Sequence, residues 1–259
     1  MQLIDTHCHL DAAEFGGHQA ELLQAAQAAG VKRIVVPTVT RANFAAVHAL
    51  CERYPDCFPA YGIHPMFVDD AIPDDLEILH DFLRERNPVA IGEIGLDFFI
   101  EHYDQARQEH FFAEQLKLAR EFDLPVLLHT RRAQDTILKH LRQIKVRGGV
   151  SHAFSGSRQQ ADEFIRLGFK LGFGGAMTYP RATRLRELAT TLPLSCIVLE
   201  TDAPDMPPEF VERGQPNQPE YLLRIAQTLA NLRGISLEEL AQATTENALA
   251  VLNRLPPVN

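Results

Sequence analysis

Short apolar runs rich in β-branched residues alternate with longer amphipathic stretches along this chain. We predict eight strands from the runs, at Gln2–Thr6, Arg33–Pro37, Cys57–Gly62, Val89–Glu93, Pro125–His129, Gly149–His152, Phe169–Gly172 and Cys196–Thr201. The stretches between them have the spacing of helices. This alternation is typical of βα units arranged around a parallel sheet.

The clearest helix is predicted at Ala106–Phe122, where Phe112, Leu116 and Ala119 share one face. A ninth helix is predicted at Ser236–Leu252, because Ser236-Leu237-Glu238-Glu239 has the Ser-x-x-Glu pattern of a capping box. The Pro-rich stretch Pro204–Pro219 is predicted to be a loop after the eighth strand.

Eight βα units indicate a TIM (β/α)8 barrel. A chain of 259 residues with 46% hydrophobic content matches the roughly 250 residues of one such barrel, so we expect a single domain over residues 1–259. The alternative is a doubly wound open sheet, which would leave the polar strand ends scattered.

Composition limits where in the cell the protein is expected and in which redox state its cysteines are expected. No apolar run has the roughly 18 residues of a membrane span, and we see no signal peptide, so we expect a cytoplasmic protein without membrane contact. The four cysteines form no Cys-x-x-Cys pair and are read as reduced thiols, mostly in the core. No protein partner is evident, and a monomer or weak oligomer is expected.

Metal-binding side chains recur at the predicted strand ends: His7, His9, Glu93, His129, His152 and Asp202, with His64 at a further end. His7 and His9 share one face of an extended strand and can bind one ion together. In a parallel barrel all strand C-termini open at one mouth, so residues far apart in sequence converge there. A buried charge needs a partner, and a metal ion is the best candidate for this set.

The other histidines are assigned differently. Five of them lie in helical stretches and are expected at the surface, namely His18, His48, His80, His110 and His140. His102 is left open.

A net charge of −9 argues against general attraction to a polyanion, so nucleic-acid contacts must be local. The basic candidates are Arg131-Arg132, directly after His129, and the group Arg181, Arg184 and Arg186. Ordinary surface charge explains the second group equally well.

The motifs at the strand ends resemble those of the TatD family of metal-dependent deoxyribonucleases, closest to the YjjV-type branch. They read LIDTHCHLD (Leu3–Asp11), GIHP (Gly62–Pro65), GEIGLD (Gly92–Asp97), HAFSG (His152–Gly156) and ETDAP (Glu200–Pro204). They span nearly the whole chain in family order. The resemblance implies a barrel of the amidohydrolase-like superfamily that hydrolyses phosphodiesters with two divalent cations.

Carried over by position, the resemblance makes His7, His9 and Asp202 ligands of one ion and His129 and His152 ligands of the other, with Glu93 as the bridge. No lysine stands at a strand end to supply a carbamate bridge, and Glu93 offers two oxygens instead. Zn²⁺, Mg²⁺ and Mn²⁺ all remain open. The residues after Asp202 and the loop Gly214–Pro219 depart from the family pattern, and they leave substrate identity open.

Three catalytic roles follow from this chemistry. Asp202 is the candidate proton acceptor, Glu93 bridges the ions, and His64 contacts a phosphoryl oxygen, or else is a structural histidine before Pro65. Asp97 and Arg131 are candidate substrate contacts, for which surface salt bridges are an equal alternative. Asp5 either orients a ligand histidine or satisfies backbone donors.

The leading hypothesis is a deoxyribonuclease that acts at 3′ ends or at abasic or damaged sites. A second hypothesis is a hydrolase with the same metal site that acts on a small molecule and cleaves a phosphomonoester, an amide or a lactone. A third is a metal-occupied binding protein without turnover, against which the presence of Asp202 argues.

Overall fold

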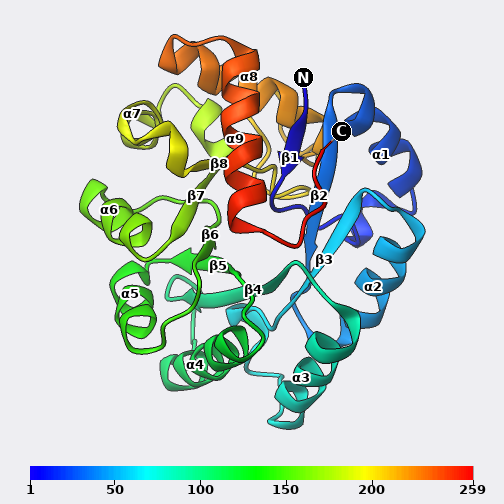
Figure 1. Ribbon diagram of the computed structural model, residues 1–259, viewed down its shortest axis with the longest axis vertical. Coiled ribbons are helices and arrows are strands. Elements are labelled where there is room, and N and C mark those ends of the chain that lie inside the picture. Colours follow the sequence, from blue (N-terminus) through cyan, green and yellow to red (C-terminus); the bar gives the residue numbers. More distant parts are fainter. Residues whose placement is uncertain (259) are drawn as a thin grey trace.

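A computed structural model describes residues 1–258 as a ring of parallel strands surrounded by helices (Figure 1). The strands within that range are β1 (Leu3–Asp5), β2 (Val31–Pro37), β3 (Cys57–Tyr61), β4 (Ala90–Asp97), β5 (Val126–Arg131), β6 (Gly149–Ser151), β7 (Phe169–Phe173) and β8 (Ile197–Leu199). Neighbours in sequence are neighbours in the sheet, and all pairs are parallel.

The helices of the described residues follow the strands in alternation. They are α1 (Gln19–Ala28), α2 (Phe44–Arg53), α3 (Asp74–Arg86), α4 (Gln105–Glu121), α5 (Gln134–Gln143), α6 (Arg158–Arg166), α7 (Thr183–Thr191), α8 (Leu222–Arg233) and α9 (Leu237–Val251). Short 3-10 turns lie at Ala13–Phe15, Arg41–Asn43, Pro65–Phe67, Gly175–Thr178, Leu194–Cys196 and Pro219–Tyr221. None of these helices is both long and apolar enough to cross a bilayer.

The ring closes between β8 and β1 through the residues just beyond the two strands. The Thr6 backbone N–H donates to the Leu199 carbonyl at 3.1 Å, and the Asp202 N–H donates to the His7 carbonyl at 2.8 Å. Both the strand order and this closure confirm the predicted (β/α)8 barrel. They exclude the doubly wound sheet, in which the first and last strands would lie apart.

Three predicted C-terminal strand ends differ from the structure by two residues or more, and one of them is that of β5, which ends at Arg131 and not at His129. β4 continues past Glu93 to Asp97, because residues Ile94–Asp97 pair with Leu128–Arg131 of β5. Gly95 permits this pairing: it has φ +153°, and a Cβ there would lie 1.9 Å from the His129 carbonyl oxygen. β8 instead stops at Leu199, since the Thr201 N–H donates to the Asp5 carboxylate rather than to a neighbouring strand.

The predicted helices agree closely with the structure. α4 runs from Gln105 to Glu121 and buries Phe112, Leu116 and Ala119. The Ser236 hydroxyl caps α9 by accepting the Glu239 N–H at 3.1 Å.

The helical histidines agree with the prediction only in part. His18 and His110 are exposed, as expected, whereas His48 and His80 are half-buried. His140 is buried, with its Nε2 3.0 Å from the Glu109 carboxylate and its ring 5.5 Å from that of Phe112, both on α4. All four cysteines are free thiols, and Cys8, Cys57 and Cys196 are buried.

The barrel interior is a small apolar cluster separate from the outer core. Val35 and Leu127 belong to it, whereas their strand neighbours pack outward against the helices. α9 seals the end of the barrel where the strands begin, and it contributes Ala248, Val251 and Leu252 to the same cluster. Figure 1 shows α9 and the C-terminal segment across this end. The opposite end, where the strands finish, is left for the polar residues.

We expect Leu252→Ala to lower the free energy of unfolding by about 2–5 kcal/mol, because Leu252 is fully buried in the barrel plug and its truncation leaves a cavity. Leu249→Ala is the matched control: Leu249 lies on the same helix but is only partly buried. Urea unfolding of both variants measures the difference. Equal losses would show that α9 does not seal the barrel.

Candidate metal centre

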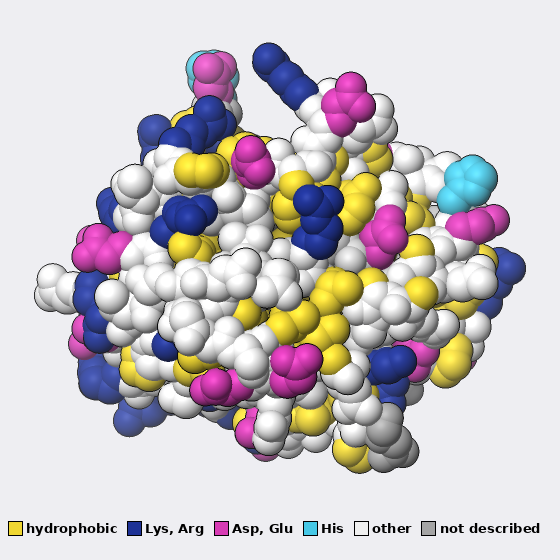
Figure 2. All heavy atoms as spheres, turned by 90° about the horizontal axis from the view of Figure 1, so that it is seen from above, with side chains coloured by type: hydrophobic (Ala, Val, Ile, Leu, Met, Phe, Trp, Pro, Cys, Tyr) yellow, Lys and Arg dark blue, Asp and Glu magenta, His cyan; other side chains and the backbone are white. Residues whose placement is uncertain are grey.

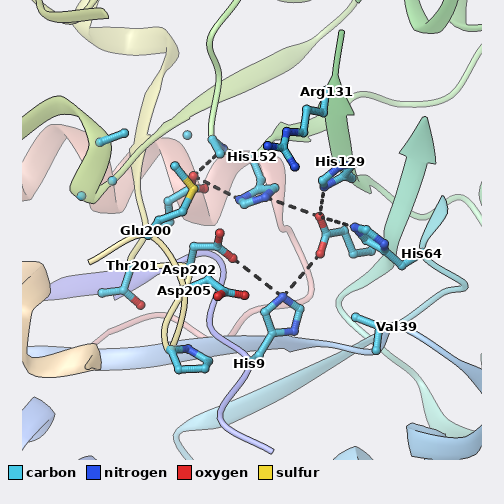
Figure 3. Close-up of a pocket in the computed structure, with 18 of the residues that line it drawn as sticks. His9, Val39, His64, His129, Arg131, His152, Glu200, Thr201, Asp202 and Asp205 are labelled. Atoms are coloured by element: carbon cyan, nitrogen blue, oxygen red, sulfur yellow. Dashed lines mark hydrogen bonds and ion pairs between the residues drawn. The ribbon is translucent and has the colours of Figure 1, made fainter. Parts of the chain in front are cut away.

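The predicted polar residues converge on one cavity of about 820 Å³ at the C-terminal end of the strands (Figure 3). His7 and His9 follow β1, His64 follows β3, and Glu93 and His129 lie within β4 and β5. His152 follows β6 and Asp202 follows β8. Three overlapping groups of these side chains are close enough to hold a metal ion, namely His7, His9 and Asp202; His7, Glu93 and His152; and His64, Glu93 and His129.

The first set of donor atoms surrounds the end of β1. His7 Nε2 lies 3.3 Å from His9 Nε2, 3.1 Å from Glu93 Oε2 and 3.7 Å from Asp202 Oδ1. His9 Nε2 lies 3.5 Å and 3.7 Å from the same two oxygens. Ligands at roughly 2.0–2.2 Å from one metal stand roughly 3.3–3.6 Å apart, and the separations of His7, His9 and Asp202 are close to that range, so these three side chains could hold one ion.

The second set is built around the other oxygen of the same carboxylate. Glu93 Oε1 lies 3.0 Å from His129 Nδ1, 3.4 Å from His152 Nε2 and 3.5 Å from His64 Nε2. Glu93 therefore stands between the two sets, with one oxygen in each.

Two carboxylates behind the second set orient its histidines. His129 Nε2 is 2.9 Å from Asp97 Oδ2, and His152 Nδ1 is at an ion-pair distance of 3.3 Å from Glu200 Oε1. A carboxylate attracts the ring proton to its own side, so the opposite nitrogen keeps a lone pair for a metal. These contacts favour His129 Nδ1 and His152 Nε2 as the atoms available to a metal.

His64 has the opposite tautomer. Its Nδ1 accepts the Met66 backbone N–H at 3.2 Å, so in the neutral ring the proton is on Nε2, which faces the cavity. A ring nitrogen that carries a proton has no lone pair for a metal. His64 is therefore built as a hydrogen-bond donor toward the site.

The structure places the remaining predicted contacts as follows. Asp97 is fully buried and its oxygens face His129 and the Phe99 N–H, which favours positioning of His129 over contact with substrate. Asp5 accepts the backbone N–H groups of His7 and Thr201 and touches no histidine ring, so it satisfies backbone donors and ties β1 to the end of β8. Arg131 lines the cavity and is exposed.

Glu200 is the residue that sequence reasoning missed. It is buried, its Oε1 accepts the Ala153 N–H at 2.5 Å, and its Oε2 has no partner among the described residues. Gly172 of β7 makes room for it, because a Cβ there would lie 2.1 Å from Oε2. An acid directly after the apolar run Ile197–Leu199 was the available signal.

Burial and the neighbouring charges lower the pKa of some histidines in the site and raise the pKa of others. Burial lowers the pKa of His7 to about 3 and that of His64 to about 4. Burial acts in the same direction on His9 and His152, but nearby carboxylates outweigh it and raise their pKa values to about 9 and about 10.

The pKa values of the carboxylates Asp202 and Glu93 shift in opposite directions. Burial raises the pKa of Asp202 to about 6. For Glu93 the surrounding histidines outweigh burial and hold its pKa well below the usual range. An ionised carboxylate, together with imidazole nitrogens once they have lost their protons, is a set of donors that suits a divalent metal, so these residues fit one.

Two arginines of the second basic group, Arg184 and Arg186, form hydrogen bonds within the protein. Arg184 donates to the Ser155 carbonyl and Arg186 to the Thr178 carbonyl, which supports a structural role for both. In Figure 2, Lys and Arg side chains are interspersed with Asp and Glu on the face shown, with no continuous basic field.

Metal binding should release protons and strengthen as the pH rises from about 6 to about 9. Without metal, the raised pKa values keep His9 and His152 protonated in this range, and a metal must displace those protons. Titration calorimetry of Zn²⁺ in two buffers of different ionisation enthalpy measures the release. Binding without proton release would contradict the electrostatics described above.

Gly172→Ala should lower metal content and stability together, because the new methyl group displaces Glu200 and leaves His152 without its carboxylate. The double variant Gly172→Ala/Glu200→Ala is the control: it should regain thermal stability but not metal. Metal analysis and thermal unfolding report the two effects. Full metal content and wild-type stability in Gly172→Ala would remove Glu200 from the site.

Comparison with known proteins agrees with the geometry. The sequence model described as TatD related DNase matches residues 4–253. The chain is 46% identical to the Escherichia coli metal-dependent hydrolase YjjV over 97% of its own length and 98% of that protein. It is 34% identical to the Bacillus subtilis metal-dependent hydrolase YabD, covering 95% and 97%.

Solved structures give the same result. The crystal structure of the YjjV TatD homolog from Escherichia coli superposes with a TM-score of 0.94 at 45% identity and covers 98% of both chains. A TatD family hydrolase from Entamoeba histolytica shares the fold, with a TM-score of 0.84 at 21% identity and coverage of 97% and 98%. With its barrel, its cluster of metal-binding side chains and these matches, the chain belongs to the TatD family of metal-dependent hydrolases.

Proposed function

We propose that this protein is a two-metal phosphodiesterase that acts on DNA, at a 3′ end or at an abasic or damaged site. The observation that carries the proposal is Glu93, whose two oxygens each face a separate set of ligand atoms. Two bound cations would lower the pKa of a water and neutralise charge on the attacking and leaving oxygens of a phosphoester. The histidine majority favours Zn²⁺ or another late transition metal over Mg²⁺.

The chain's own residues supply the proton transfers and the orientation. Asp202 points its Oδ1 at His7 and His9, which leaves Oδ2 to accept a proton from the attacking water. The raised pKa of Asp202, about 6, brings this carboxylate closer to neutral pH than an ordinary aspartate. In this proposal His64 Nε2–H, which lies 3.5 Å from Glu93 Oε1, donates to a phosphoryl oxygen of the bound substrate.

A second candidate is a hydrolase of small phosphomonoesters, amides or lactones that uses the same residues. The cavity volume of about 820 Å³ favours it, since small-molecule sites usually enclose about 300–1,000 Å³. The family membership and the metal donors are shared by both candidates, so the substrate must be tested directly.

Metal-replete protein and a chelated control are incubated with end-labelled single-stranded DNA, an abasic duplex, p-nitrophenyl phosphate and p-nitrophenyl esters. Metal-dependent shortening or incision of DNA supports the nuclease, and the labelled end gives its polarity. Activity confined to the small substrates would replace it with the second candidate.

Asp202→Asn should lower turnover by at least about a hundredfold at saturating metal, because the amide cannot accept the proton. Because Asp202 Oδ1 also belongs to the first donor set, metal content is measured alongside the rate. Circular dichroism checks that the fold is retained. A fully metal-loaded Asp202→Asn protein with wild-type turnover would remove Asp202 from the mechanism.

A further inference from the structure

Two consecutive arginines, the first of which lines the cavity, pack on the same aromatic ring. The guanidinium carbon of Arg131 lies 3.8 Å from the centre of the Phe99 ring, and that of Arg132 lies 4.4 Å from it. Phe99 itself is 45% exposed, just beyond the end of β4. The ring therefore holds two positive charges together at the protein surface.

The backbone makes this arrangement possible. Consecutive side chains of an extended strand point to opposite faces, so Arg131 and Arg132 would normally diverge. Arg132 instead has φ +55°, in the left-handed region that residues other than glycine seldom adopt. This turn of the chain at the end of β5 brings the second guanidinium round to the ring that the first one already covers.

Neither guanidinium group has a direct ion-pair partner. Among the described residues, no carboxylate oxygen lies within 4.0 Å of a side-chain nitrogen of Arg131 or Arg132. The nearest acid along the sheet, Asp97, is paired with Arg131 in the strand register and its pKa is lowered in part by the Arg131 charge, but its oxygens face His129 and the Phe99 N–H. Two adjacent guanidinium groups whose N–H donors are not bound to a carboxylate are suited to bind an anion.

Binding of an anion in this cavity requires positive charge, because many of its lining side chains are acidic. Seven carboxylate side chains line it, namely Asp11, Glu14, Glu93, Asp97, Glu200, Asp202 and Asp205. Within residues 1–258, Arg131 is the only lysine or arginine that lines it. The exposed acids Glu14 and Asp205 would repel a polyanion that approached this mouth, so Arg131 is the side chain there with a permanent positive charge.

Arg131 lies close in the strand to one of the metal-binding histidines. Arg131 is two residues beyond His129 on β5, so both side chains face the same way, with Cα atoms about 6.6 Å apart. Figure 3 shows Arg131 beside His129 at the edge of the cavity. The Arg131 side chain therefore extends from the strand beside that of His129, where it can reach a phosphate adjacent to one held at the metal site.

We propose that Arg131 and Arg132, braced on Phe99, bind the phosphate next to the scissile one, so that the preferred substrate is a strand with at least two phosphates. This inference rests on the proposed nuclease function and assigns the pair a phosphate other than the reacting one. The anion is either an internal linkage or a terminal monophosphate, which share the same chemistry.

The test uses an oligothymidylate with phosphorothioate linkages, which keep the charge and resist hydrolysis. Its binding to metal-replete protein is measured by fluorescence anisotropy at several salt concentrations. The double variant Arg131→Gln/Arg132→Gln should bind about tenfold more weakly and lose about 0.7 of the salt slope for one phosphate contact. Arg53→Gln is the matched control: this exposed arginine also lies on an aromatic ring, Tyr54, but at the end of α2, away from the cavity.

A second arm identifies the phosphate. A neutral methylphosphonate is placed at one linkage at a time, and parallel strands carry or lack a terminal phosphate. At the linkage that contacts the pair, wild type and double variant should bind equally, because the charge is already gone. If only removal of the terminal phosphate abolishes the difference, the bound group is the terminal monophosphate.

The outcomes separate this inference from the proposed function. Equal affinity and salt slope for wild type and double variant would overturn the arginine site, even if both proteins degrade DNA. A wild type that fails to bind the oligonucleotide would overturn it as well. Whether the wild type hydrolyses unmodified DNA is scored separately, and that result alone decides the nuclease function.

Discussion

The buried carboxylate of Glu93 is the interaction on which the rest of the site depends. It is 2% exposed and lies among five histidines, whose interactions with it outweigh burial and hold its pKa well below the usual range. Each of its oxygens belongs to a different donor set. The side chains around it are held by further carboxylates, because Asp97 and Glu200 lie behind His129 and His152. The site is thus a layered array of acids and imidazoles rather than a simple ring of ligands.

The barrel supplies the geometry that this array needs. Among residues 1–258, apolar side chains and α9 fill the barrel from the end where the strands begin, and the polar residues gather at the end where the strands finish. Glycines in the strands also determine where the side chains of the metal centre lie. Gly95 lets β4 lie against β5, which brings Glu93 to His129, and Gly172 leaves the space that the Glu200 carboxylate occupies. Two glycines therefore contribute to the metal centre without carrying any chemical group of their own.

The electrostatics of the mouth complement those of the centre. The cavity walls are acidic, which suits cations and opposes a phosphate, so substrate binding requires positive charge brought in by the metals and by the rim. Arg131 and Arg132 stand at the point where the ligand strand β5 leaves the barrel. The scaffold that orients His129 thus also presents the guanidinium groups.

The sequence by itself determined the barrel and the convergence of its polar strand ends, because strand periodicity and strand-end polarity are local patterns. It also indicated His7, His9, Glu93, His129, His152 and Asp202 as one group. Tertiary structure alone decided the roles of Glu200 and Asp97, the tautomer of His64 and the burial of His140. Each of these depends on which atom faces which across neighbouring strands or helices, and no spacing along a single chain records that contact.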